Sequence, residues 1–88
     1  MVQSEIQVTN KLGLHARPAA MLVQTASKFR SEISLKKDDV EANAKSILSV
    51  MMLAAEAGSL VTIKAEGEDE QQAVETLTKM FEEKFGEE

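Results

Sequence analysis

The stretch Leu12–Ala20, Leu-Gly-Leu-His-Ala-Arg-Pro-Ala-Ala, contains the only histidine and the only proline of the chain. Gly13 allows a sharp turn of the backbone, and Pro18 suits the first turn of a helix, where its missing N–H has no partner to lose. The apolar residues that follow recur at helical spacing: Ala19, Leu22, Val23 and Ala26. The sequence therefore predicts a helix that begins close to His15.

Two polar side chains are expected at the N-terminus of this helix. His15 would lie beside unpaired backbone N–H groups and the positive end of the helix dipole. Arg17 adds a permanently charged guanidinium that suits phosphate oxygens. A nucleophilic nitrogen beside a site for anions is a place where a phosphoryl group can sit and be bonded. Taken singly, however, His15 is equally an exposed capping residue and Arg17 an ordinary solvated charge.

Length and composition exclude several classes of protein. The 88 residues suffice for one domain with a modest core, which we expect to span residues 1–88. With no cysteine and a single histidine, neither a disulfide nor a metal site is predicted, and no cofactor is expected. The net charge of −5 and the absence of Trp and Tyr argue against nucleic-acid binding. Without a signal peptide or a membrane-length apolar run, we expect a cytoplasmic protein with no membrane insertion.

Alternating apolar and polar residues predict the strands. Such alternation runs over residues 2–8, 32–36 and 61–65. Asp38-Asp39 is a turn candidate, and a short strand around residues 40–42 would complete a hairpin with the strand before it.

Helical periodicity and capping residues set the limits of the first two helices. The first helix should run from about Ala16 to Lys28. Ser46 is a plausible N-cap for a short helix over residues 47–55, which Gly58 would end.

The last helix is predicted from a cap and a long apolar stripe. Asp69 can cap it, with Gln72 completing a capping box. The stripe consists of Ala73, Val74, Leu77, Met80, Phe81 and Phe85. The acidic run Glu66–Glu70 and the charged tail after Glu82 are interpreted as solvated surface, and no site is assigned to either.

These elements follow the order βαββαβα with short connections. Three one-sided helices on an antiparallel sheet make an open-faced α+β sandwich, with the helices covering one face. Periodicity alone does not choose between sheet orders, and a ferredoxin-like arrangement fits the first six elements equally well.

The short second helix is apolar around nearly its whole circumference. Its apolar residues are Ile47, Leu48, Val50, Met51, Met52 and Leu53. A helix on one face of an open sheet buries only part of such a surface, so some of these residues should be exposed and should meet a partner. The alternative is a helix that lies deeper in the core.

Three segments of the chain together resemble a known family. Residues 13–19 read Gly-Leu-His-Ala-Arg-Pro-Ala, residues 43–47 read Asn-Ala-Lys-Ser-Ile, and residues 67–71 read Gly-Glu-Asp-Glu-Gln. In sequence and in spacing they resemble the active-site signature, the regulatory serine segment and the approach to the last helix of HPr. HPr is the histidine phosphocarrier of the bacterial phosphoenolpyruvate–sugar phosphotransferase system. The resemblance covers essentially the whole chain.

This resemblance implies a four-stranded antiparallel sheet of order 1-4-2-3 backed by three helices. It implies that His15 takes a phosphoryl group at Nδ1 from phospho-enzyme I and passes it to enzyme IIA domains. Arg17 and the backbone of Ala16 would hold the phosphoryl group. The protein would then be a stoichiometric carrier, expected to be monomeric, and not an enzyme with its own turnover.

By the same resemblance, Ser46 is the residue that an ATP-dependent HPr kinase/phosphorylase modifies, and a transcriptional regulator could read the phosphoserine. The first two helices would lie side by side with their N-termini near one partner-facing surface. The residues expected on that surface are Ala16, Arg17, Ala20, Ile47, Leu48 and Met51.

The chain departs from the commoner family patterns at a few positions. Asp38-Asp39-Val40 stands where many members have Asn-Gly, which affects only the turn. Ser49 stands where glycine is frequent, and Leu48 where Met or Phe is usual. The last two positions face partners, so the identity of the regulatory partners stays open.

Two other functions fit the same residues. The first is a regulatory binding protein that works through Ser46 and the apolar surface of the second helix, or a nitrogen-related relay. The second is a small domain that merely binds an anion at the helix N-terminus.

Overall fold

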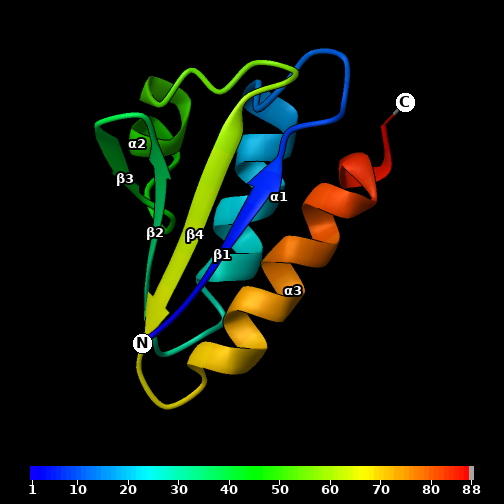
Figure 1. Cartoon of the computed structure of the whole chain (residues 1–88). Coiled ribbons are helices and arrows are strands. Elements are labelled where there is room, and N and C mark those ends of the chain that lie inside the picture. The colour runs from blue at the N-terminus through cyan, green and yellow to red at the C-terminus, as the bar shows by residue number, and fades with distance from the viewer. Residues whose placement is uncertain (88) are drawn as a thin grey trace.

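The computed structural model describes residues 1–87, and within them four strands and three helices make up the fold (Figure 1). The strands are β1 (Val2–Gln7), β2 (Glu32–Lys37), β3 (Val40–Asn43) and β4 (Leu60–Glu66). The helices are α1 (Ala16–Ala26), α2 (Ile47–Met52) and α3 (Glu70–Glu82), and a short 3-10 turn, η1 (Lys84–Gly86), follows α3. The predicted order of elements is confirmed.

The strands form one antiparallel sheet in the order β1-β4-β2-β3. Strand β4 lies between β1 and β2, so that Ile63 is paired with Ser4 on one side and with Leu35 on the other. All three helices cover the same face of the sheet (Figure 1). The open-faced sandwich is therefore confirmed, and the strand order decides the choice that periodicity left open.

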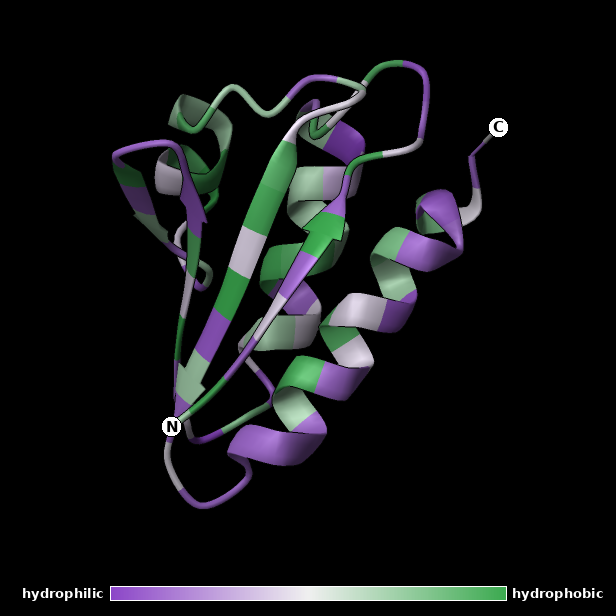
Figure 2. Ribbon diagram, viewed as in Figure 1, coloured by the Kyte–Doolittle hydropathy of each residue, from purple (hydrophilic) through white to green (hydrophobic). Residues whose placement is uncertain are grey.

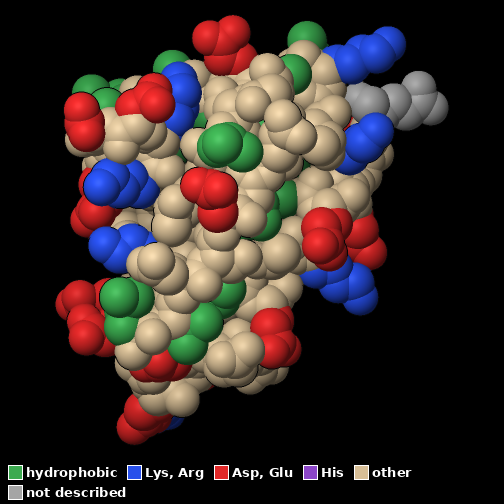
Figure 3. Space-filling model, in the orientation of Figure 1, with side chains coloured by type: hydrophobic (Ala, Val, Ile, Leu, Met, Phe, Trp, Pro, Cys, Tyr) green, Lys and Arg blue, Asp and Glu red, His purple; other side chains and the backbone are tan. Residues whose placement is uncertain are grey.

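The two faces of the sheet differ in polarity, which explains why only one is covered. Val61, Ile63 and Ala65 of β4 are buried, and the residues between them, which lie on the opposite face, are partly exposed. Figure 2 shows the hydropathy of the residues along this strand. Leu22 of α1 and Phe81 of α3 close the core from the helical side, each no more than 2% exposed. Figure 3 looks onto the open face, where acidic, basic and apolar side chains are scattered.

Helix α2 is shorter than predicted, because it ends at Met52 and not at Ala55. Ala54 takes a left-handed backbone conformation with a φ of 52°, which breaks the helix well before Gly58. Gly58 belongs instead to the loop that enters β4, where its N–H donates to the carbonyl of Val8 at 2.8 Å.

Helices α1 and α2 lie side by side but run in opposite directions (Figure 1). The N–H of Leu14, just before α1, donates to the carbonyl of Ala55, just after α2, at 2.8 Å. At the other end, the Lys45 ammonium before α2 donates to the carbonyl of Phe29 beyond α1 at 2.7 Å. The two N-termini therefore lie at opposite ends of the helix pair. Ser46, at the start of α2, lies by the C-terminal end of α1.

The capping box predicted at the start of α3 is also wrong. Asp69 is the N-cap residue, but in the described chain its side chain makes no bond to the helix. Its carboxylate instead accepts the N–H groups of Arg30 and Ser31 at 2.9 and 3.0 Å, and the Ser31 hydroxyl at 2.6 Å. These bonds lower the pKa of Asp69 to about 2, and the bond from the Ser31 hydroxyl contributes most to the shift. This part of the acidic run therefore ties the loop before β2 to the loop before α3.

After α3 ends at Glu82, the chain turns back towards α1. Lys84, Phe85 and Gly86 all have positive φ values, of 56°, 54° and 76°. The Phe85 ring is only 2% exposed and meets the ring of Phe81 edge-on, with the centroids 4.9 Å apart. This turn carries the chain to the N-terminal end of α1, where Nη1 of Arg17 donates to the carbonyl of Phe85 at 3.4 Å.

Candidate functional site

A tight turn presents His15 at the start of α1. Gly13 has a φ of 67°, and a Cβ there would lie 2.5 Å from the carbonyl oxygen of Ala55, so both the conformation and the contact require glycine. Leu14 is buried, and His15 is the N-cap residue of α1. Its carbonyl accepts the N–H of Ala19 at 2.9 Å. The predicted position of His15 at a helix N-terminus is confirmed.

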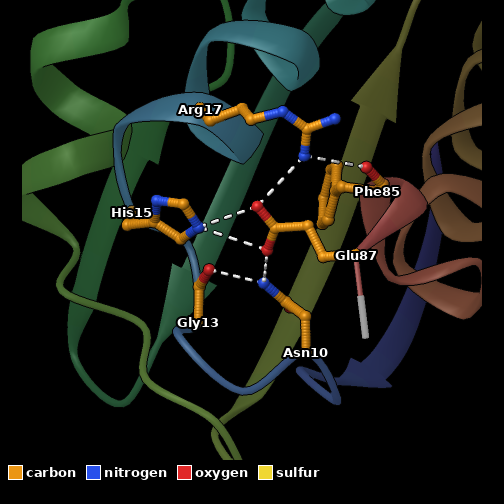
Figure 4. Close-up of polar contacts among 6 residues, drawn as sticks. All are labelled: Asn10, Gly13, His15, Arg17, Phe85 and Glu87. Carbon is orange, nitrogen blue, oxygen red and sulfur yellow. Dashed lines mark hydrogen bonds and ion pairs between the residues drawn. The ribbon is translucent and has the colours of Figure 1, made fainter.

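The imidazole of His15 does not cap the helix. Its side chain is 33% exposed, and Nε2 lies 2.9 and 3.1 Å from Oε2 and Oε1 of Glu87 (Figure 4). The other ring nitrogen, Nδ1, lies on the side of the ring away from Glu87 and has no hydrogen-bond partner among residues 1–87. That nitrogen is therefore not engaged by a hydrogen bond within the described residues.

Arg17 lies beside the imidazole and shares the same carboxylate (Figure 4). Its Nη1 donates to Oε2 of Glu87 at 3.0 Å and to the carbonyl of Phe85 at 3.4 Å. The side chain is 58% exposed, and within residues 1–87 neither Nε nor Nη2 makes a hydrogen bond. The guanidinium thus keeps donors for a further anion.

Asn10 holds the same carboxylate from below the imidazole (Figure 4). This residue is 1% exposed, and its Nδ2 donates to the carbonyl of Gly13 at 2.7 Å and to Oε1 of Glu87 at 2.9 Å. The hydrogen bond from Asn10, followed by those from His15 and Arg17, holds the pKa of Glu87 below its usual value against the opposing effect of desolvation. Glu87 is therefore a carboxylate at neutral pH.

The sequence interpretation missed both Asn10 and Glu87. The sequence predicts a solvated tail after Glu82, yet the Glu87 side chain is only 17% exposed and contacts both His15 and Arg17. One signal was present in the sequence: Phe85 continues the apolar stripe of α3, and its burial holds residues 86 and 87 against the fold.

Helix α2 displays an apolar surface, as predicted. We call its exposed residues the α2 patch: Ile47, Leu48, Met51 and Met52, which are 42%, 68%, 43% and 72% exposed. Among the other residues expected on a partner-facing surface, Ala16 and Arg17 are exposed and Ala20 is partly buried. A shallow hollow of about 220 Å³ lies between the loop before α1 and the loop after α2. Its lining includes Leu12, His15 and Ala55.

Ser46 is the N-cap of α2, as predicted. Its hydroxyl oxygen accepts the N–H of Ser49 at 3.3 Å. The structure places Ser46 at the end of the α2 patch that lies farther along α1, by its C-terminus, and not beside His15.

Residues 1–87 contain no group of three or more His, Cys, Asp or Glu side chains arranged to hold a metal ion. In the same part of the chain no helix is long and apolar enough to cross a membrane.

The fold and the site together define a class of protein: a small open-faced α+β sandwich that presents one histidine and one arginine at a helix N-terminus. The family described as the phosphotransferase-system HPr component, phosphorylation site, matches residues 2–83. A phosphocarrier protein HPr from Xylella fastidiosa is 51% identical over 87 residues, which cover 99% of this chain and 98% of that protein. The chain therefore belongs to the HPr family.

Solved structures agree with this assignment and extend it. The crystal structure of an HPr from Thermoanaerobacter tengcongensis superposes with a TM-score of 0.97 at 51% identity, covering 100% of this chain and 99% of that one. The Bacillus subtilis catabolite repression protein Crh, described as a dimer with a swapped domain, has a TM-score of 0.77 at 49% identity, covering 94% and 95%. The family thus includes relatives connected with catabolite repression.

Proposed function

We propose that this protein is a phosphocarrier that accepts a phosphoryl group on Nδ1 of His15 and passes it on. The observation that carries the proposal is the pairing of an unengaged Nδ1 with the free donors of Arg17 at the N-terminus of α1. Backbone N–H groups of the first turn, beginning with Ala16, would hold the phosphoryl oxygens, and the guanidinium would neutralise their charge.

The donor would be phospho-enzyme I, itself phosphorylated from phosphoenolpyruvate, and the acceptors enzyme IIA domains in the cytoplasm. The chain would act as a stoichiometric carrier and not as an enzyme, because it offers one nucleophile and one clamp. Its partners would supply the remaining catalytic groups. The α2 patch would dock these partners together with Arg17 and Ala20.

The direct test is to incubate the protein with enzyme I, Mg²⁺ and phosphoenolpyruvate, and to map any acid-labile phosphate. We expect one phosphoryl group, on His15. His15→Ala should fold normally, because the imidazole is partly exposed and makes no cap bond, and it should accept nothing. Acid-labile phosphate retained in that variant would contradict the assignment.

A second function, regulation through binding, is favoured by one specific observation. Ser46 caps α2 at the edge of the α2 patch, so a kinase such as HPr kinase/phosphorylase could change both its charge and its surroundings. A transcriptional regulator would then read the phosphoserine. In a purely regulatory protein Ser46 would be modified, whereas His15 would pass no phosphoryl group to a sugar-specific IIA domain.

We propose that the carrier is a monomer, since the α2 patch and the His15 site would both face partners. The alternative is a dimer, such as the swapped dimer described for Crh. Light scattering on the purified protein should give the mass of one chain, and twice that mass would contradict the monomer.

A further inference from the structure

Residues 84–87, which follow α3, are held against the His15 site. Lys84 and Phe85 adopt left-handed backbone conformations, which cost energy for residues other than glycine. Burial of the Phe85 ring against Phe81 compensates for this cost. Two backbone bonds close the turn: the Gly86 N–H donates to the Glu83 carbonyl at 3.0 Å, and the next N–H donates to the Lys84 carbonyl at 2.8 Å. The tail thus delivers the side chain of residue 87 to one place.

The carboxylate of Glu87 is fixed there by three side chains. Oε1 accepts from Asn10 at 2.9 Å, Oε2 accepts from Arg17 at 3.0 Å, and Nε2 of His15 bridges both oxygens. Asn10 is itself buried and bound to the carbonyl of Gly13, so the carboxylate has a rigid support on the side away from solvent. The phosphoryl transfer proposed above assigns no role to this carboxylate.

An ionised carboxylate can only accept hydrogen bonds, and this determines the tautomer of the imidazole. Nε2 must carry the proton that points to Glu87, and the lone pair must then lie on Nδ1. A carboxylate that orients a histidine in this way is a recurrent device in catalytic triads and metal sites.

We propose that Glu87 is a positioning residue: it keeps the proton on Nε2 of His15, so that Nδ1 is the nucleophile, and it stabilises the ring while the ring carries the phosphoryl group. This inference rests on the proposed function and adds to it a residue from the C-terminal tail.

The transfer step then needs no movement of a proton. The lone pair of Nδ1 forms a bond to phosphorus, the bond between phosphorus and the donor atom breaks, and its electron pair leaves with the donor. The Nε2 proton stays in place, so the imidazole gains a positive charge. The carboxylate 2.9 Å away stabilises that charge as it develops, and transfer to an acceptor reverses each step.

Two measurements on the full chain test this role. Nitrogen NMR of the His15 ring reports which nitrogen carries the proton, and single-turnover kinetics with phospho-enzyme I report the rate. We would compare the unmodified protein with Glu87→Ala and Glu87→Gln. Glu82→Gln is the matched control, because Glu82 is exposed and the substitution changes the net charge equally.

In the unmodified protein we expect a hydrogen-bonded Nε2–H signal and a deprotonated Nδ1. Glu87→Ala should lose that signal and slow phosphorylation about tenfold, the usual cost of removing such an orienting partner. Glu87→Gln should keep an acceptor for Nε2–H but lose the negative charge, so its rate should fall between the two. Glu82→Gln should match the unmodified protein, and thermal melts should confirm that all variants fold.

Unchanged or faster phosphorylation of Glu87→Ala would overturn the proposal, and a faster rate would mean that the tail occludes the site. A protonated Nδ1 in the unmodified protein would overturn it equally. Failure of the proposed function looks different. In that case the unmodified protein takes no phosphate on His15, while its ring spectrum still reports whether Glu87 holds the Nε2 proton.

Discussion

His15 and Arg17 share one carboxylate, and this arrangement sets what each does when a phosphoryl group arrives. The guanidinium uses only Nη1 for Glu87 and the Phe85 carbonyl, so Nε and Nη2 remain as donors for phosphoryl oxygens. Its contribution should therefore appear in the transfer step more than in docking.

Arg17→Ala should slow phosphoryl transfer to His15 strongly and weaken binding to enzyme I only slightly. The loss of such a contact costs about 2–4 kcal/mol of transition-state stabilisation. Single-turnover kinetics over a range of enzyme I concentrations separate the two effects. Arg17→Lys is the control, and it should recover only part of the rate because an ammonium lacks the planar pair of donors. Unchanged transfer in Arg17→Ala would make Arg17 an ordinary surface residue.

At this scale the sequence identified the residues whose chemistry is local. His15 and Arg17 are close in the sequence and lie at a helix start that Pro18 marks, so their pairing could be predicted. Asn10 and Glu87 could not, because they meet across 77 positions of the chain. No local pattern distinguishes a carboxylate that folds back from one in a solvated tail.

At the scale of elements, the antiparallel packing of α1 and α2 changes how Ser46 would act. Ser46 lies away from the His15 end of α2, so added charge there would act on a docked partner and not on the imidazole. The α2 patch extends from Ser46 towards His15, so a partner docked on it would meet both the charge at Ser46 and the imidazole.

Ser46→Asp should slow phosphorylation of His15 at low salt, because a negative charge at the edge of the α2 patch repels an acidic partner and is costly to desolvate. Its thermal stability should be equal or slightly higher, since a carboxylate also caps a helix N-terminus. Ser46→Ala should lose about 1 kcal/mol of stability and accept phosphate at nearly the normal rate. Equal rates for Ser46→Asp and the unmodified protein would leave Ser46 as a cap only.

Asp69 gives a prediction for acid stability. Its pKa is lowered to about 2 in the folded protein from a value of 3.8, so its stabilising effect is complete above pH 4. The effect should be lost as the pH falls from about 4 towards 2, when the folded carboxylate takes up a proton. The free energy of unfolding measured across this range should converge for the unmodified protein and Asp69→Ala. A difference as large at pH 2 as at neutral pH would contradict this role.

Elements were predicted where local chemistry decides them and mispredicted where a distant contact competes. Ser46 caps α2 because its own helix offers the nearest donor. Asp69 has the same kind of local donor at α3, yet it binds the backbone of Arg30 and Ser31, which only the folded sheet brings near. Helix α2 ended early for a similar reason: Leu53 and Ala55 are both buried, and Ala54 between them adopts the left-handed turn.

At the scale of the whole molecule, the layers followed from periodicity but the strand order did not. Alternation along β4 identifies its buried face, whereas its neighbours β1 and β2 are distant in the sequence. That order was implied only by the resemblance to HPr. The result is a sheet that supports α1 from behind, with the turn after α3 reaching the N-terminus of α1, so that one histidine is presented beside an arginine and a carboxylate that contact each other.

The measurement that tests the central claim most directly is a chase of the phosphoryl group. The protein is loaded with labelled phosphate from phosphoenolpyruvate and enzyme I, separated from them, and mixed with an enzyme IIA domain. A carrier should hold about one phosphoryl group per chain, on Nδ1 of His15, and should pass it to the IIA domain within the mixing experiment. Label that remains on the chain, or label at any other residue, would contradict the claim that this protein relays phosphoryl groups through His15.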